Sequence, residues 1–343
     1  MSPWYLHISS CFLIVWMLWY CSHLQPMFTI KTLSKEMLAT VDGNFIEINL
    51  LNSTLKSANI TFLPTNFINM CQMRREKNVT LLVFIPSAPH NILNREVIRS
   101  TWASAEGSSA IREGKAKVFF LLGGGESTRS MVNDELQKHN DIIIIDIPDT
   151  YRNLLLKVYA IFQIGTRMCS STFIHKADDD VVINIDRFFL GVNNVFFTGV
   201  KAIYCIVWLS VKPIRDARDK WHVPASAYSS KTYPNYCSGS SYVGTREAFE
   251  SILKAAPAVE QIFLEDVFFT GLIAERAEVE RVDRSSMFSN SEPKKKCERT
   301  TYGTTALMSM YGIKDAASIT RAWRTVRAAC GANNMLDYEK TDP

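Results

Sequence analysis

Short apolar runs alternate with helical patterns through the middle of the chain. Runs of strand length cover residues 81–85, 118–122, 142–145 and 172–175, and helices are predicted around 95–102, 133–138 and 153–168. This alternation is typical of an α/β fold in which helices cover both faces of a mostly parallel central sheet. Ligands bind such sheets at the carboxyl ends of the strands. The residues that follow each run are therefore the first candidates for chemistry.

Three consecutive acids follow the fourth predicted strand. Asp178, Asp179 and Asp180 have apolar residues on both sides, and a buried carboxylate is costly unless it is paired or bound to a cation. In an extended segment Asp178 and Asp180 would lie on one face and Asp179 on the other. Two carboxylates on one face suit Mg²⁺ or Mn²⁺, which keep open positions for phosphate oxygens. An acidic surface turn is the alternative.

The N-terminal stretch predicts a membrane anchor. Residues 3–24 contain no Asp, Glu, Lys or Arg, and the stretch is long enough to span a bilayer. We expect an uncleaved transmembrane anchor over residues 1–25, with a cleaved signal peptide as the competing interpretation. No Lys or Arg precedes the stretch, so the distribution of positive charge leaves its orientation open.

The remainder of the chain divides into a stem, a folded domain and a tail. Residues 26–78 are polar and predict a lumenal stem, with N-glycosylation acceptor patterns at Asn52, Asn59 and Asn78. The folded domain is expected over residues 79–335. Residues 336–343 form a tail.

Composition narrows the classes of function. The 343 residues, 47% of them hydrophobic, can bury one large core or two modest ones. A formal net charge of +4 gives no electrostatic case for binding nucleic acid. Six cysteines lie outside the N-terminal apolar stretch, at Cys71, Cys169, Cys205, Cys237, Cys297 and Cys330. None shows a C-x-x-C spacing for zinc, so we expect disulfides formed in a secretory compartment, with the pairing open.

A last helical pattern lies near the C-terminus. One face of it carries Ile319, Trp323, Val326 and Cys330, with Asp315 placed to cap the start and Gly331 to end it. This helix is expected to pack against the core.

Five ordered motifs carry a resemblance to a known family. They are R-E-V-I-R-S-T-W at 95–102, D-I-I to D-T-Y-R-N-L and Lys157 at 141–157, K-A-D-D-D-V at 176–181, K-W to Y-P-N-Y-C-S-G and Y-V at 220–243, and E-D-V with Gly271 at 265–271. In this order they resemble the beta-1,3-glycosyltransferases, which include beta-1,3-galactosyl- and N-acetylglucosaminyltransferases and form family 31 of the glycosyltransferases. The similarity spans roughly residues 81–271.

The resemblance implies a GT-A fold and an inverting transfer. The donor would be a UDP-sugar, galactose being our expectation, with Mn²⁺ or Mg²⁺ as the metal and a beta-1,3 linkage to a glycan hydroxyl as the product. Inversion in one displacement needs a base opposite the leaving diphosphate. The family places that base at the position of Asp266. The alternative, from the residues alone, is that Glu265 and Asp266 are carboxylates in the first turn of a helix, where the helix dipole favours negative charge.

The resemblance also assigns roles to the other candidates. The metal ligands would be Asp180 and Asp178, and the nucleotide-sugar would be surrounded by Arg95, Arg99, Lys157, Asp178 and Asp179. The acceptor or sugar would face Trp221, Tyr236, Gly239, Tyr242 and Glu265. The alternatives are ion-paired helix charges for the basic residues, core packing for the aromatic ones and a plain turn for Gly239.

The expected setting is the Golgi membrane, with a single-pass type II anchor, a lumenal domain and an acceptor glycan on a glycoprotein or glycolipid. The main rival is a catalytically inactive protein of the same fold that binds glycans or serves as a scaffold. A metal-dependent phosphatase is a third hypothesis. It needs a turn signature after a nucleophilic aspartate, which Val181 and Val182 do not supply.

Overall fold

The computed structural model describes residues 39–42, 45–50, 58–64, 79–169, 171–289, 308–313 and 315–329. The predicted anchor, Asn52 and Asn78 lie outside the described residues, and Asn59 falls within strand β3 (Ala58–Pro64). Among the residues described, no helix has the length and apolar character needed to cross a membrane.

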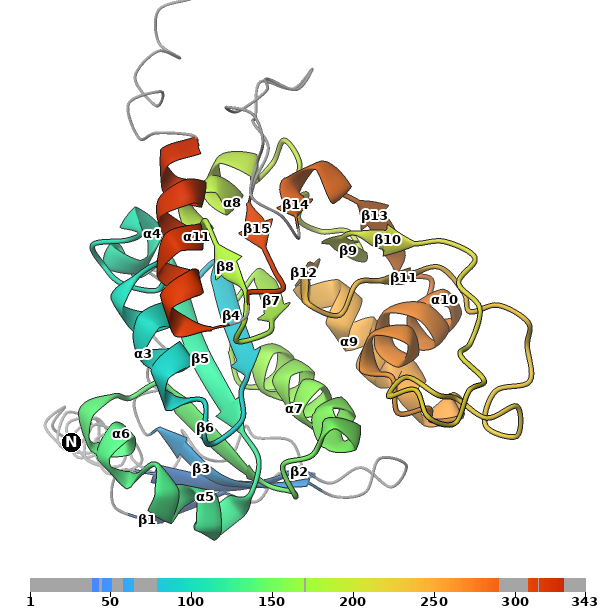
Figure 1. Ribbon diagram of the computed structural model, residues 1–343, viewed down its shortest axis with the longest axis horizontal. Coiled ribbons are helices and arrows are strands. Elements are labelled where there is room, and N and C mark those ends of the chain that lie inside the picture. Colours follow the sequence, from blue (N-terminus) through green and yellow to red (C-terminus); the bar gives the residue numbers. More distant parts are fainter. Residues whose placement is uncertain are drawn as a thin grey trace, which may run out of the picture.

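A ten-stranded sheet forms the centre of the molecule (Figure 1), in the order β1-β2-β3-β6-β5-β4-β7-β12-β9-β13. Its strands are β1 (Ala39–Asp42), β2 (Phe45–Leu50), β3, β4 (Leu81–Pro86), β5 (Ala116–Leu122), β6 (Ile142–Asp146), β7 (Phe173–Ala177), β9 (Ala202–Cys205), β12 (Ser241–Thr245) and β13 (Glu280–Asp283). The four central strands, β6, β5, β4 and β7, are parallel. Antiparallel pairs flank them on both sides, through β3 on one side and β12 on the other. The sheet is therefore mixed, with a parallel centre.

The sheet begins earlier in the chain than the sequence predicts. Residues 39–64, expected as part of a polar stem, supply β1, β2 and β3, and β3 pairs antiparallel with β6. β1, β2 and β3 pair in sequence as antiparallel neighbours, and only the pairing of β3 with β6, some eighty residues further along the chain, attaches them to the central sheet, which local periodicity does not reveal.

Side chains of the central strands alternate between two cores, one on each face of the sheet. One core joins Leu82 and Phe84 to helices α7 (Leu154–Arg167) and α9 (Arg246–Ala255) and to the π-helix η3 (Val267–Ile273). The other joins Leu81, Val83 and Ile85 to α3 (Ile92–Ser100), α6 (Asn133–Lys138), α8 (Ile185–Gly191) and α11 (Ala316–Ala329). Both faces are buried, which explains why most positions of these strands are apolar.

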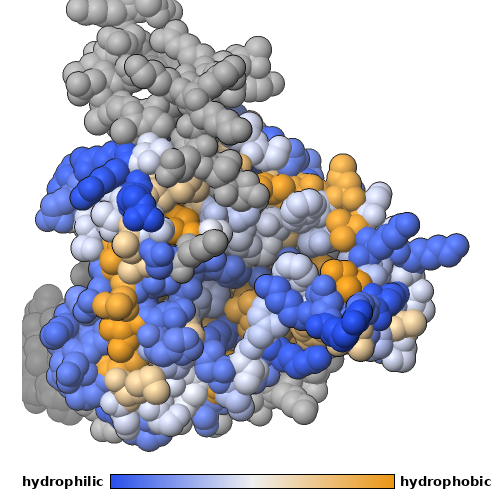
Figure 2. All heavy atoms as spheres, viewed as in Figure 1, coloured by the Kyte–Doolittle hydropathy of each residue, from blue (hydrophilic) through white to orange (hydrophobic). Residues whose placement is uncertain are grey.

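Short elements complete the fold. They are α4 (Ser109–Arg112), α5 (Gly125–Met131), α10 (Ala274–Arg276), β8 (Val182–Ile183), β10 (Val207–Trp208), β11 (Tyr236–Cys237), β14 (Phe288–Ser289), β15 (Ser309–Met310) and the 3-10 turns η1 (Tyr151–Asn153), η2 (Ala256–Ala258) and η4 (Ser285–Met287). Hydrophilic side chains cover most of the face shown in Figure 2, and the hydrophobic ones gather in separate patches.

The predicted strands and helices between residues 81 and 177 are confirmed, with ends that shift by a few residues. The C-terminal helix is confirmed as α11. The backbone N–H of Ser318 donates to Asp315 Oδ1 at 2.7 Å, and Ile319, Trp323 and Val326 are buried. The predicted positions Cys330 and Gly331 lie outside the described residues.

A disulfide joins Cys205 at the end of β9 to Cys237 in β11. It closes the long loop that carries residues 206–236 at the edge of the sheet. Thr270 Oγ1 accepts a hydrogen bond from the backbone N–H of Cys237 at 2.9 Å, so this crosslink is also tied to η3. Cys169 is disulfide-bonded as well. The expectation that cysteines of this chain form disulfides is confirmed.

Buried His175 on β7 predicts a loss of stability in acid. Burial, with the neighbouring Lys176 charge, lowers the pKa of His175 from 6.5 to about 3. Between these two pH values the histidine is protonated in the unfolded chain and neutral in the folded chain. The free energy of unfolding should therefore fall as the pH drops from 6.5 toward 3, by about 1.4 kcal/mol per pH unit from this group. Chemical denaturation of His175→Gln at several pH values should show a shallower decline.

The exposed His90 provides the control. His90→Gln should keep the full acid-dependent decline of the parent protein. Equal slopes for the parent and His175→Gln between pH 6 and pH 4 would contradict the assignment.

Candidate active site

The site lies where the strand order reverses. β4 lies between β5 and β7: the chain continues from β4 to β5 and β6 on one side, and β7 is added on the other side. The loops that follow β4 and β7 therefore start at neighbouring strand ends. Crevices at such switch points are the usual ligand sites of open α/β sheets. The two loops touch: Asp179 Oδ2 accepts hydrogen bonds from Ser87 Oγ at 2.6 Å and from Asn91 Nδ2 at 2.8 Å.

The aspartate triplet forms a turn between β7 and β8, so the expected extended segment is wrong. Asp178 Oδ1 lies 2.6 Å from Lys176 Nζ, and Asp179 faces the loop after β4. Asp180 lines a cavity together with Asp179. Strict alternation of faces does not apply in a turn, and Asp178 and Asp180 consequently have different surroundings.

Asp180 is the carboxylate of the triplet with an unsatisfied oxygen. Its Oδ1 is buried and has no hydrogen-bond partner in the structure. Burial, together with the charges of Asp178 and Asp179, raises the pKa of Asp180 to about 6. The adjacent cavity has a volume of about 620 Å³ and is bordered by Asn91, Asn94 and the first residues of α11. This volume lies within the usual range of a small-molecule pocket.

Within the part of the chain that the structure describes, no three His, Cys, Asp or Glu side chains converge as a metal-binding group. Asp178 is engaged by Lys176 through Oδ1, and Asp179 is engaged by Ser87 and Asn91 through Oδ2. The unpartnered oxygen of Asp180 is the atom that a cation would satisfy directly.

Glu265 and Asp266 immediately precede η3. Glu265 is buried, with Oε1 at 3.0 Å from Lys176 Nζ and Oε2 accepting from Tyr242 Oη at 3.2 Å. Burial raises the pKa of Glu265 to about 7. Asp266 is partly buried, its Oδ1 accepts the backbone N–H of Val267 at 2.8 Å, and burial raises its pKa above the ordinary value. Both acids are thus more basic than carboxylates in water.

Gly239 lies directly against this acid pair. A Cβ atom at position 239 would stand 3.0 Å from Asp266 Oδ2 and 3.2 Å from Glu265 Oε1. The carbonyl oxygen of Gly239 also accepts a hydrogen bond from Lys176 Nζ. The close approach expected of this glycine is therefore an approach to the acid pair itself.

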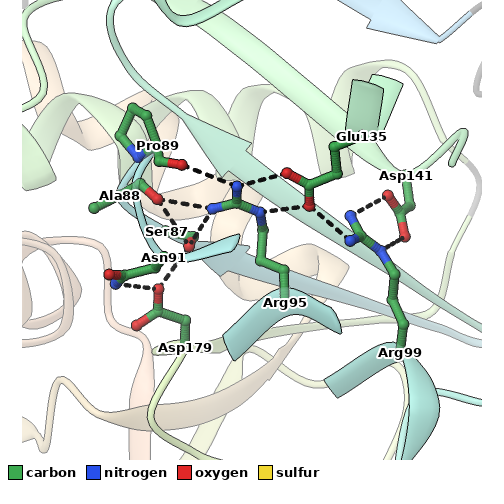
Figure 3. Close-up of polar contacts among 9 residues, drawn as sticks. All are labelled: Ser87, Ala88, Pro89, Asn91, Arg95, Arg99, Glu135, Asp141 and Asp179. Atoms are coloured by element: carbon green, nitrogen blue, oxygen red, sulfur yellow. Dashed lines mark hydrogen bonds and ion pairs between the residues drawn. The ribbon is translucent and has the colours of Figure 1, made fainter. Parts of the chain in front are cut away.

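Arg95 and Arg99 do not face a ligand, and their predicted nucleotide contacts are revised. Arg95 is 0% exposed and its five N–H groups are all bonded: to both carboxylate oxygens of Glu135, to the carbonyls of Ala88 and Pro89 and to Ser87 Oγ (Figure 3). Arg99 binds Glu135 and, through two nitrogens, Asp141. These buried pairs fix the loop between β4 and α3.

Lys157 of α7 also contacts the loop that follows β4. Its Nζ donates to the carbonyl of Ser87 at 2.9 Å and lies 2.8 Å from Asp149 Oδ2. The side chain is nearly buried, and burial lowers its pKa. Lys157 therefore reaches the loop after β4 at the site, where it holds a backbone carbonyl.

The aromatic candidates separate into two groups. Tyr242 is fully buried beneath Lys176, so the prediction that it faces a sugar is wrong. Trp221 is 45% exposed, and its indole N–H donates to Tyr151 Oη at 2.9 Å. Tyr236 is partly buried, and burial with the charge of Asp266 raises its pKa.

Comparison with known proteins shows the family. The family model described as Galactosyltransferase matches residues 93–285. The chain is 30% identical over 257 residues to Beta-1,3-galactosyltransferase 1 of Homo sapiens and of Mus musculus, an alignment that covers 73% of this chain and 76% of theirs. The chain belongs to the galactosyltransferase family. The resemblance seen in the motifs is thereby confirmed, and the protein is a hexosyltransferase.

Further relatives of this galactosyltransferase-family chain include Beta-1,3-galactosyltransferase 5 of Homo sapiens, which is 34% identical over 224 residues, 62% of this chain and 69% of that one. Among solved structures, the galactosyltransferase LgtC in complex with donor and acceptor sugar analogs aligns with a TM-score of 0.39 and 13% identity, covering 73% of this chain and 96% of that chain. Mouse xyloside xylosyltransferase 1 aligns at 0.34 with 12% identity, covering 68% and 97%. Structural likeness at this level supports no conclusion.

Tyr151 is a further candidate, to which the sequence analysis gave no role. It is 49% exposed, it accepts the hydrogen bond from Trp221, and its pKa is raised by burial and by the charges of Asp266, Glu265 and Asp178. Tyr151 lies in the second motif of the resemblance, which also contains Lys157. Its position inside that motif is the feature of the sequence from which a role could have been predicted.

Gly239→Ala should lower catalysis while leaving the protein folded. The new methyl group would press on Asp266 Oδ2 and Glu265 Oε1 and displace the acid pair, and a misplacement of about 1 Å costs roughly a hundredfold in rate. Transfer assays with thermal unfolding measured alongside test this. Gly114→Ala is the control for lost stability: a Cβ there meets nothing within 4 Å, but the backbone φ of +74° strains an alanine, so this variant should unfold more easily than the parent while keeping full activity. Full activity of Gly239→Ala would mean that the acid pair tolerates displacement.

Proposed function

We propose that this protein transfers galactose from UDP-galactose to a hydroxyl of an acceptor glycan, in beta-1,3 linkage and with inversion, through a site of GT-A type. One observation carries the proposal: Asp180 and Asp266 each keep a carboxylate oxygen without a donor among the described residues, while Lys176 pairs with Glu265 and with one oxygen of Asp178. Two available acids with separate surroundings suit a reaction that needs one at the leaving group and one at the acceptor.

The relatives support the choice of sugar and linkage. Those described above are named beta-1,3-galactosyltransferases, and the alignment with the first of them covers most of both chains. The cavity of about 620 Å³ beside Asp179 and Asp180 has room for a ligand of the size of a nucleotide-sugar. It lies at the switch point of the sheet, where such ligands are expected.

The residues fit a bound Mn²⁺ or Mg²⁺. Asp180 would hold the cation through its unpartnered Oδ1, and Asp178 through the oxygen that Lys176 leaves unpaired. Hard oxygen ligands of this kind suit both metals. When bound, such a cation offsets the negative charge that develops on a departing diphosphate.

Asp266 is the proposed base. It would take the proton from the acceptor hydroxyl as the new C–O bond forms to the anomeric carbon and the sugar–phosphate bond breaks, with the electron pair leaving on the diphosphate oxygen. Burial raises the pKa of Asp266, which makes it a better proton acceptor than an aspartate in water. Gly239 gives the base its room, because no side chain there crowds Oδ2.

Tyr151 and Trp221 are proposed to receive the acceptor glycan. Both rings are about half exposed, and the hydrogen bond between them fixes their relative orientation. Phe263 supports Tyr151 edge to face at 6.5 Å. Aromatic faces suit the C–H side of pyranose rings, and Tyr151 lies within electrostatic range of Asp266.

We further propose that the protein works in the Golgi lumen, held by an N-terminal type II anchor. The Cys205–Cys237 disulfide supports an oxidising compartment. The sequence composition of residues 3–24 supports the anchor.

Asp266→Asn should lower the turnover number by two to four orders of magnitude, the usual range for loss of a general base. The side chain keeps its shape and loses the ability to accept a proton. The assay follows UDP release from UDP-galactose with a panel of acceptor glycans and Mn²⁺, and repeats it with a chelator.

Asp216→Asn makes the same chemical change at an exposed loop and should leave the rate unchanged. Transfer by Asp266→Asn at the parent rate would refute the assignment of the base. Absence of acceptor-dependent UDP release from the parent protein with every donor and acceptor would favour the rival, an inactive glycan-binding protein. Equal activity in the chelator would remove the metal from the proposal.

Tyr151→Ala should raise the KM for the acceptor about tenfold and leave the KM for UDP-galactose unchanged, because the ring and the hydrogen bond to Trp221 are lost together. Initial-rate kinetics with either substrate varied will separate the two constants. Phe197→Ala removes an aromatic ring of similar exposure from the loop before β9 and should change neither. A rise confined to the donor KM would place Tyr151 on the nucleotide side.

A further inference from the structure

Lys176 is a buried cation at the centre of the site. It is 0% exposed, and its Nζ lies 2.6 Å from Asp178 Oδ1 and 3.0 Å from Glu265 Oε1 while donating to the carbonyl of Gly239. These three oxygens match the three donors of an ammonium group. The nitrogen also lies 5.8 Å from the centre of the Tyr242 ring.

The three contacts join segments that are distant in sequence. Lys176 is on β7, two residues before the triplet begins, and Gly239 belongs to the loop that leads into β12. Glu265 belongs to the segment that starts η3 and also carries Asp266. One side chain therefore connects the metal-side acids, the glycine loop and the proposed base.

The backbone around Lys176 is well anchored, so the side chain is held in place from below. Lys176 pairs with Tyr242 across the antiparallel β7 and β12 strands, and the N–H of Asp178 donates to the carbonyl of Ser240 at 2.9 Å. Among the described residues, no strand pairing joins β7 to the segment of Glu265 and Asp266. Lys176 binds that segment from β7 through its ion pair with Glu265, and Tyr242 of the neighbouring β12 donates to the other oxygen of Glu265.

We infer that Lys176 is a positioning residue, an inference that rests on the proposed function. Its ammonium group holds the segment of Glu265 and Asp266 at a set distance from the aspartate triplet. The base and the leaving-group side of the reaction are thereby kept in one geometry. Lys176 touches neither substrate in this arrangement, because its three donors are occupied by Asp178, Gly239 and Glu265.

Tests of this inference must separate position from folding. Removing only the cation leaves two carboxylates without their partner, and breaking a buried ion pair in this way is strongly destabilising. Lys176→Met combined with Glu265→Gln removes both charges of the buried pair and keeps similar volumes. Asp178 loses the same ammonium partner, but its side chain is 36% exposed and can be hydrated, so this double variant should remain folded. The experiment compares it with Lys176→Met, Glu265→Gln and Lys176→Arg.

We expect the double variant to unfold within a few degrees of the parent and to bind UDP, measured by calorimetry with Mn²⁺, with an affinity within threefold of the parent. Its turnover number should fall about a hundredfold, as for a small misplacement of a catalytic group. The losses in the two single variants should not add up in the double variant, because both break the same link. Lys176→Arg keeps the charge and should recover at least a tenth of the parent rate.

Lys115→Met removes an exposed lysine that is paired with an exposed Glu113, and should alter nothing. A folded double variant with the parent turnover number would overturn the inference and leave the proposed function intact. A parallel loss of UDP affinity and turnover would also overturn it, in favour of a purely structural lysine. No transfer by the parent protein would remove the proposed function and this inference together.

Discussion

The site depends on the compensation of buried negative charge at the carboxyl edge of the sheet. Asp178, Asp180, Glu265 and Asp266 gather there, and burial raises the pKa of all four. The ammonium group of Lys176 reaches Asp178 and Glu265. Selective pairing therefore commits Glu265 and one oxygen of Asp178 to the structure, and leaves Asp180, Asp266 and the other oxygen of Asp178 for chemistry. Without that division, neighbouring buried acids would compete for protons and lose their separate roles.

A second set of buried charges makes the edge rigid. Arg95 binds both oxygens of Glu135 and two carbonyls of the loop after β4, and Lys157 binds the carbonyl of Ser87 in the same loop. Ser87 in turn donates to Asp179. The basic residues of this region thus act on the site through the loop that anchors the triplet. Arginine suits this use because its planar fork satisfies a carboxylate and several carbonyls at once.

Local pattern predicted the parallel centre well and the roles of single residues less well. The run 142–145 follows from the apolar pattern, because a strand buried on both faces reads as a continuous apolar run. Arg95 and Tyr242 were misplaced because motif position says that a residue matters without saying what it contacts. Glu135, the partner that buries Arg95, lies forty residues away and belongs to no motif. The attachment of strands β1 to β3 to the sheet was missed for a similar reason, since the pairing of β3 with β6 is long-range.

The same long-range pairing explains how the two acid clusters meet. β12 runs antiparallel beside β7, so the loop that leads into β12 lies next to the triplet that leaves β7, and the N–H of Asp178 reaches the carbonyl of Ser240. Gly239 then has to pass between the triplet and the acid pair. A side chain there would collide with Asp266, whereas a bare backbone offers its carbonyl to Lys176. The glycine, the lysine and the acid pair are consequently one unit, and a change in any one of them alters the spacing of the others.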